Sequence, residues 1–325
     1  MLYSPSVSEP FINNLKESYR IRLPEKIWHR TFGSWWRSWG VSDAIAQEHT
    51  TIFHGLSNEI PFGINRARTK TVVTIHDLLF LEYPEHYPSF DRKIYEAKTR
   101  YAGKQADKVI TVSEETKRDL IIRYRVPAEK IEVVYPIVSI PSTAQPIHVP
   151  SPYILNVGSL VARKNQKRLI EAYALIEKNV QEELWIVGSG PLKQELGQLI
   201  NQLKLGARVK VITGLHNQVL AALYKNATAF IYPSLKEGFG MPIVEALLSE
   251  IPVVASAGGA IEEAAGPGSL FCDPQSSPEI AQQITRVLND KRLRQEMISS
   301  GVIHAQKMNS KNLSEQLMAV YNSML

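Results

Sequence analysis

The chain has 325 residues, of which 44% are hydrophobic and 21% are charged, a composition typical of globular proteins. This composition excludes a fibrous or largely disordered protein, and the length predicts two domains because single cores seldom grow beyond about 250 to 300 residues. The net charge of +5 is too small to favour nucleic acid as a partner.

The cysteine content and the hydropathy pattern exclude further classes of protein. The single cysteine, Cys272, excludes an intramolecular disulfide or a thiolate metal cluster. No apolar run approaches the ~20 residues of a membrane-spanning helix, and the chain does not open on a typical signal peptide. We therefore expect a cytoplasmic protein whose membrane contact, if any, is peripheral.

Residues 1–140 contain short apolar segments that are typical of buried strands. Helix-length connections separate them, so they predict a parallel sheet covered by helices, in a first doubly wound lobe. The segments are TIFH at 51–54, TVVTIHD at 71–77, DKVITVS at 107–113 and KIEVVYP at 130–136.

Residues 26–40, KIWHRTFGSWWRSWG, place tryptophans beside Lys26, Arg30 and Arg37. Aromatic and basic side chains together suit a membrane interface, where a lipid-linked acceptor could be presented. The alternative is a helix that packs its tryptophans inward. Gly33 and Gly40 favour this second interpretation, because they interrupt a long amphipathic helix.

A proline-rich stretch, PIVSIPSTAQPIHVPSP at 136–152, follows the first lobe. Proline removes a backbone donor and breaks helices and central strands, so the stretch predicts a linker, which we place at 141–152.

Residues 153–306 predict a second doubly wound lobe with right-handed crossovers. Its expected strands are YILNVG at 153–158, LWIVG at 184–188, VKVIT at 209–213, ATAFIYP at 227–233 and IPVVAS at 251–256. Two or three helices are expected from Pro278 onward. The last of them, 307–325, carries an apolar series and is expected to pack back on the first lobe.

Ligands of open α/β sheets bind beyond the carboxyl ends of the strands, so the loops that follow strands are the candidate sites. Gly158 makes a turn after the 153–158 segment, and Arg163 and Lys164 then stand at the start of a helix. Two cations and helix amide groups suit a diphosphate. An ordinary solvated basic turn explains the same residues equally well.

A second strand ends in Gly188 and Gly190, with Pro191 opening a helix. On its own this Gly-x-Gly pattern is weak evidence. A purely structural turn explains it at least as often as a close approach of a ligand.

The segment YPSLKEGFGMPIVEAL at 232–247 carries the strongest signal. Gly238 and Gly240 let a substrate meet bare backbone on either side of Phe239. Glu237 lies on the loop and Glu245 near the helix start, so both carboxylates could bind hydroxyls in one crevice. The alternative is a surface charge at Glu237 and a helix-dipole partner at Glu245.

These segments together resemble the retaining glycosyltransferases of family 4, which share the GT-B fold. The matching stretches include VGSLVARKN at 157–165, IVGSGP at 186–191 and YPSLKEGFGMPIVEAL at 232–247. VVTIHD at 72–77 and ADKVITVSEETKRDLI at 106–121 extend the resemblance into the first lobe. The resemblance implies two Rossmann-like lobes facing a cleft, with the first βα unit of the N-terminal lobe missing.

The resemblance also implies roles for individual residues. Lys164 and Arg163 would contact the donor diphosphate, and Glu237 would hold hydroxyls of the transferred sugar near the donor-binding backbone of Gly238, Phe239 and Gly240. Glu245 would bind the ribose, and the base would lie at 214–220. His76 would face the donor sugar, whereas without the resemblance a buried, satisfied histidine is the simpler interpretation. Asp77 would cap or orient it.

The implied reaction is transfer of a hexosyl unit from a nucleotide sugar to a hydroxyl of a glycan or lipid-linked acceptor, with retention and without an essential metal or other cofactor. The stretch HDLLFLEYPEHYP at 76–88 resembles bacterial mannosyltransferases of polysaccharide biosynthesis, which favours mannose from GDP-mannose. Two alternatives stay open: a GT-B nucleotide-sugar epimerase, and a non-catalytic or impaired nucleotide-sugar-binding protein.

Overall fold

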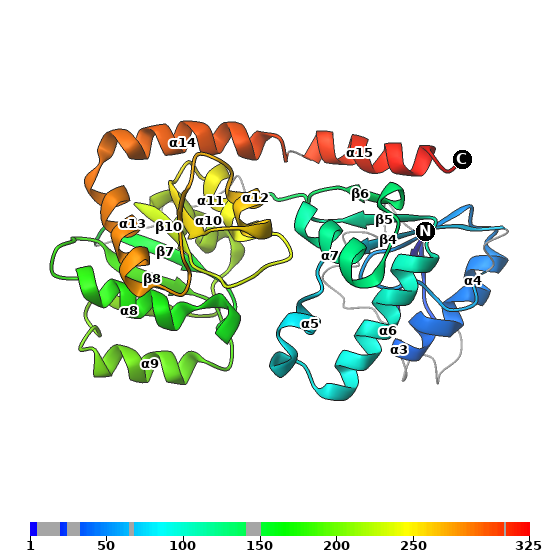
Figure 1. Ribbon diagram of the computed structural model, residues 1–325, viewed down its shortest axis with the longest axis horizontal. Helices are drawn as coiled ribbons and strands as arrows, with labels where there is room; N and C mark the ends of the chain where they lie inside the picture. Colours follow the sequence, from blue (N-terminus) through cyan, green and yellow to red (C-terminus); the bar gives the residue numbers. More distant parts are fainter. Residues whose placement is uncertain (5–19, 25–32, 65–67, 141–150, 309) are drawn as a thin grey trace. The chain divides into compact units, whose positions relative to one another are not determined.

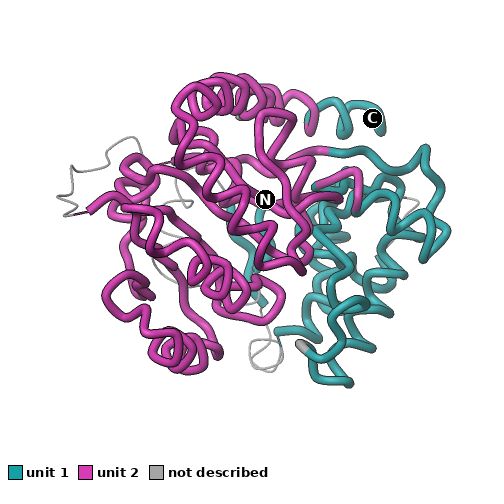
Figure 2. The backbone as a smooth tube through the Cα atoms, turned by 60° about the vertical axis from the view of Figure 1, so that its left-hand side comes forward, with its two compact units in different colours: residues 1–112, 116–133, 318–325 teal, residues 113–115, 134–317 magenta. Residues whose placement is uncertain are grey.

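A computed structural model of the chain describes residues 1–4, 20–24, 33–64, 68–140, 151–308 and 310–325. The chain divides into two compact units, which Figure 2 colours separately. The first unit comprises 1–112, 116–133 and 318–325, and the second comprises 113–115 and 134–317. Most of the expected linker, 141–150, lies outside the described residues.

The second unit is built on a six-stranded parallel sheet, whose order is β12-β11-β10-β7-β8-β9 (Figure 1). Its strands are β7 (Tyr153–Val157), β8 (Glu183–Val187), β9 (Val209–Ile212), β10 (Ala229–Tyr232), β11 (Val253–Ser256) and β12 (Leu270–Cys272). The five predicted strands are confirmed, and β12 is an addition. The order reverses between β7 and β10, so the binding crevice of a doubly wound sheet is expected beyond these two strands.

Helices cover this sheet on both faces. Buried residues of α8 (Gln166–Ile176), α9 (Lys193–Gln202) and α13 (Ser277–Asn289) form one core with inward side chains of the strands. Right-handed crossovers place α10 (Asn217–Asn226), α11 (Met241–Leu248) and α12 (Gly259–Ala265) on the opposite face. The helix α14 (Lys291–Gln306) packs against α11 and α13.

The first unit contains a four-stranded parallel sheet in the order β3-β4-β5-β6. Its strands are β3 (Ile52–Gly55), β4 (Lys70–Ile75), β5 (Lys108–Thr111) and β6 (Ile131–Val133), all four predicted from the sequence. The helices α6 (Ser89–Gln105) and α7 (Glu114–Tyr124) contribute to its core. A hollow of about 820 Å³ lies beside β3 and the two-residue strand β1 (Leu2–Tyr3).

The C-terminal helix α15 (Ser310–Asn322) ends within the first unit, since residues from Met318 onward belong to it. There the Tyr321 hydroxyl lies 2.7 Å from Nδ1 of His54, whose Nε2 lies 2.8 Å from the Thr74 hydroxyl. Burial, and secondarily His76, lower the pKa of His54 to about 4. The contact is therefore made by a neutral imidazole at pH 7.

The tryptophan segment is only partly described, because 25–32, with Lys26 and Arg30, lie outside the described residues. Trp36 is buried, but Trp35 and Trp39 are about half exposed. The expectation that the tryptophans pack inward therefore holds for Trp36 and is wrong for the other two. No helix among the described residues is long and apolar enough to cross a bilayer.

Candidate active site

Asn165, in the loop after β7, anchors this loop to neighbouring loops through its side chain. Residues Ala162–Lys164 form a 3-10 turn, and Asn165 follows in the left-handed region with φ 61° and ψ 27°. Asparagine tolerates this conformation better than most residues. Its side-chain amide donates to the carbonyls of Pro233, at 2.9 Å, and Pro274, at 2.7 Å. The turn is thereby fixed to the loops that follow β10 and β12.

The loop after β10 is fixed to the same turn through its backbone. The Leu235 amide donates to the Arg163 carbonyl at 2.8 Å, and the Arg163 guanidinium donates to the Lys236 carbonyl at 2.6 Å. The two loops at the reversal of strand order are therefore one connected structure.

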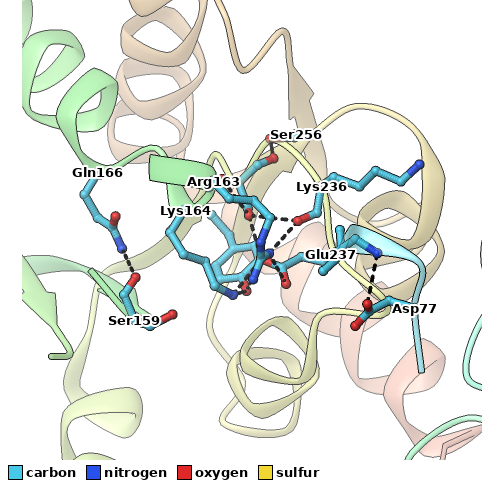
Figure 3. A network of polar contacts seen from close by, with 11 residues as sticks. Asp77, Ser159, Arg163, Lys164, Gln166, Lys236, Glu237 and Ser256 are labelled. Atoms are coloured by element: carbon cyan, nitrogen blue, oxygen red, sulfur yellow. Dashed lines mark hydrogen bonds and ion pairs between the residues drawn. The ribbon is translucent and has the colours of Figure 1, made fainter. Parts of the chain in front are cut away.

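Glu237 is the centre of this structure, and its side chain is only 9% exposed. Its Oε1 accepts hydrogen bonds from Lys164 Nζ at 2.6 Å, from the Ser234 hydroxyl at 2.6 Å and from the Tyr232 hydroxyl at 3.0 Å. Its Oε2 lies 2.6 Å from the guanidinium of Arg163. Figure 3 shows Arg163 and Lys164 converging on this carboxylate.

The cluster keeps buried charges paired, as low-dielectric surroundings require. Burial opposes ionisation of Glu237, but Lys164 and Arg163 outweigh it and hold the pKa of the carboxyl below its usual value. Burial lowers the pKa of Lys164, an effect that Glu237 offsets only in part. Lys164 and Arg163 share one carboxylate, so the cluster carries an excess of positive charge. A bound anion would therefore stabilise the charged forms of both Lys164 and Arg163.

His76 follows β4 in the first unit and is exposed, so the simpler interpretation of a buried histidine is wrong. Its Nε2 lies 2.8 Å from the Leu56 carbonyl, and its backbone amide donates to the Asn58 side chain. Because a carbonyl only accepts, Nε2 carries the proton in the neutral ring and Nδ1 is an acceptor. Asp77 caps the following turn by accepting from the Leu79 amide at 3.0 Å.

Glu245 is the fifth residue of α11 and therefore lies beyond the first helical turn. The helix dipole acts most strongly within that first turn. It lines a hollow of about 300 Å³ together with residues of α10 and the segment after β6. Burial raises the pKa of its carboxyl, and a contact with Tyr224 opposes this rise. The expected base-binding segment contributes Asn217 and Leu220 to the hollow.

Two family models match almost the whole chain. "Glycosyltransferase Family 4" matches residues 2–140, and "Glycosyl transferases group 1" matches residues 142–302. The chain belongs to glycosyltransferase family 4. Its two parallel-sheet units are those of the GT-B fold.

Similar proteins agree with this assignment. The glycosyltransferase is 28% identical to O-antigen chain mannosyltransferase B of Escherichia coli in an alignment of 322 residues. The alignment covers 94% of this chain and 80% of that protein. It is 30% identical to O-antigen chain mannosyltransferase RfbU of Salmonella typhimurium over 62% of this chain and 56% of the relative. Anabaena HepE, solved with UDP and glucose, has a TM-score of 0.72 at 20% identity, covering 98% of this chain and 90% of HepE.

The backbone packing of the site requires glycine at several positions, whether or not a ligand also approaches them. A Cβ on Gly188 would stand 1.8 Å from the Gly158 carbonyl oxygen, and one on Gly190 would stand 2.5 Å from that of Leu160. This close approach supports the structural interpretation of the Gly-x-Gly turn. Gly240 has φ 123°, a conformation that L side chains rarely adopt, and so lets the chain enter α11.

Other residues of the glycosyltransferase site were not singled out from the sequence. Tyr232 and Ser234 complete the shell of Glu237, and the only sequence signal was their place at a strand end before Glu237. Phe239, which was expected to bind the donor, is instead buried and stacks on Tyr135, with ring centroids 5.3 Å apart. Among the described residues, no group of three or more His, Cys, Asp or Glu is placed to hold a metal ion.

Glu245→Gln is expected to stabilise the free glycosyltransferase at neutral pH. The raised pKa means that ionised Glu245 costs stability above its folded pKa, and the cost disappears as pH falls through that value. The melting temperature of the variant should exceed that of the wild type at pH 8, and the gap should close toward pH 5. A gap that widens in acid would contradict this sign.

Proposed function

We propose that this family 4 glycosyltransferase moves a hexosyl unit from a nucleotide sugar to a hydroxyl of a glycan or lipid-linked acceptor in cell-surface polysaccharide biosynthesis. The observation that carries the proposal is the pair of cations, Arg163 and Lys164, at the reversal of strand order between β7 and β10. Oriented positive charge at that position suits a diphosphate. The mannosyltransferase names of the relatives favour mannose, and we take GDP-mannose as the first donor to test.

In this proposal the two cations stabilise the nucleoside diphosphate as it leaves, and the contribution is electrostatic. Glu237 holds both cations charged and oriented. Its predicted contact with sugar hydroxyls requires that it share oxygens already bonded to Lys164, Ser234 and Tyr232. Gly158, Gly238 and Gly240 bring the backbone close to the donor.

Retention of anomeric configuration is part of the same proposal. A double displacement needs a carboxylate free to attack the anomeric carbon. The Glu237 carboxylate is bonded to four protein groups, which makes it a poor nucleophile. This supports a same-face reaction in which the departing phosphate accepts the proton of the acceptor hydroxyl. The positive side chains replace a divalent ion at the diphosphate, so no metal is needed.

We assign His76, which lies in the first unit, to contact with the donor sugar. With Nε2 donating to Leu56, Nδ1 can accept a hydrogen bond from a sugar hydroxyl. The acceptor is assigned to the same unit. Because Trp35, Arg37 and Trp39 are exposed, a lipid-linked acceptor at the inner face of the cytoplasmic membrane fits this unit.

A thermal-shift panel of GDP, UDP and ADP with their mannose and glucose derivatives tests the proposal. At about 100 times its dissociation constant the correct nucleotide should add ~2.7 kcal/mol to stability. GDP and GDP-mannose should give the largest shift, and GDP-mannose with a glycan acceptor should release GDP. Binding without release would support the non-catalytic alternative, and no shift with any nucleotide would refute the proposal.

A further inference from the structure

Tyr232 is the last residue of β10, and its side chain is buried. Its hydroxyl oxygen lies 2.6 Å from Nζ of Lys164 and 3.0 Å from Oε1 of Glu237. An ammonium only donates and an ionised carboxylate only accepts, so the phenol accepts from Lys164 and donates to Glu237. Burial, and secondarily Glu237, raise the pKa of Tyr232 well above its usual value, so the phenol keeps the proton that it donates.

Lys164 is held at both ends of its side chain. The stem lies against Gly158, because a Cβ added to that glycine would stand 3.4 Å from Cδ of Lys164. At the other end, the Tyr232 hydroxyl and the Glu237 carboxylate accept two of the three N–H groups of the ammonium. Within the described part of the chain these are its only acceptors, so one N–H group remains for a ligand.

The Tyr232 hydroxyl sets the direction of that remaining N–H group. A single hydrogen bond to Glu237 would pair the charge but would let the flexible ammonium turn about the bond. The hydroxyl adds a second fixed point, which is itself rigid because the ring stacks on Phe230 with centroids 5.7 Å apart. Catalytic side chains need such support, since a misplacement of about 1 Å can cost about 100-fold in rate.

We propose that Tyr232 is a positioning residue, which holds the Lys164 ammonium so that its remaining N–H group meets the donor diphosphate. The inference rests on the proposed function, since it assumes that Lys164 binds the diphosphate. A merely structural hydroxyl would affect the stability of the protein. A positioning hydroxyl also affects the preference for a diphosphate over a monophosphate.

The test is isothermal titration of GDP against GMP, and of UDP against UMP, on the wild type, Tyr232→Phe and Tyr153→Phe. The wild type should prefer the diphosphate by ~10-fold or more, and Tyr232→Phe should lower this preference at least about threefold. The variant should fold, because it keeps the ring that stacks on Phe230. Tyr153→Phe is the matched control, because it removes a buried hydroxyl that donates to the Leu223 carbonyl, and it should leave the preference unchanged.

A double-mutant cycle shows whether Tyr232 acts through Lys164. The affinity for the diphosphate should fall in Tyr232→Phe, but it should not fall further when the same change is added to Lys164→Ala. A fall by the same factor in both backgrounds would mean that Tyr232 acts independently of the lysine, which overturns the inference.

The outcomes separate this inference from the proposed function. If Lys164→Ala loses the diphosphate preference while Tyr232→Phe keeps it, or if Tyr153→Phe loses as much as Tyr232→Phe, the inference is wrong and the proposed function stands. A wild type that binds none of the four nucleotides overturns both.

Discussion

Replacing Glu237 by alanine is expected to lower the free energy of unfolding by about 3 kcal/mol or more, the usual cost of breaking a buried ion pair from one side. The change leaves Lys164 and Arg163 buried without their common counter-ion. Urea denaturation followed by circular dichroism, at neutral pH, measures the loss.

The pH dependence gives this prediction a second readout. Because the pKa of Glu237 is lowered from 4.5, its stabilisation is present above that value and is lost as pH falls through the lower folded pKa. The difference between wild type and variant should therefore shrink in acid. Glu195→Ala is the control, since its 3.6 Å pair with Lys167 is exposed and should contribute at most ~1 kcal/mol. An equal loss in both variants would refute the central role of Glu237.

Lys164→Ala is expected to lower the rate of sugar transfer by about 10²- to 10³-fold, the usual effect of removing one group that stabilises developing charge. The protein should still fold, because Glu237 keeps its contacts with Arg163, Tyr232 and Ser234. Transfer of labelled mannose from GDP-mannose to a glycan acceptor measures the effect.

Lys167→Ala is the matched control for this second prediction. Lys167 is a neighbouring lysine on α8, and its side chain is 59% exposed in a long surface pair. Transfer by this variant should stay within about twofold of the wild type. If the two lysine variants lose activity equally, the loss reflects net charge and not a contact with the diphosphate.

The strands of the fold could be predicted because each is an apolar, β-branched run between turn residues. β12 was missed, since Leu270–Cys272 contains no β-branched residue. The contact between the loops that follow β7 and β10 was predictable only as a loop after each strand. Which loops meet depends on strand order, and strand order is set by long-range packing.

In the candidate site, too, the sequence indicated individual residues but not the contacts between residues that are far apart in the chain. Arg163, Lys164 and Glu237 stand out in the sequence, but their ion pairs join residues 73 and 74 positions apart. The sequence therefore predicted Glu237 as a sugar contact and did not reveal that two cations occupy it. Tyr224 gave no signal, because it meets Glu245 only when α10 and α11 pack together.

The most direct test of the central claim compares the affinities of GDP and GMP for the wild type and Lys164→Ala by isothermal titration. If Lys164 and Arg163 bind the donor diphosphate, the wild type should prefer GDP over GMP by at least ~10-fold, and Lys164→Ala should lose most of this preference. The same preference in both proteins would contradict the account, because Lys164 and Arg163 in the turn after β7 would then not contact the diphosphate.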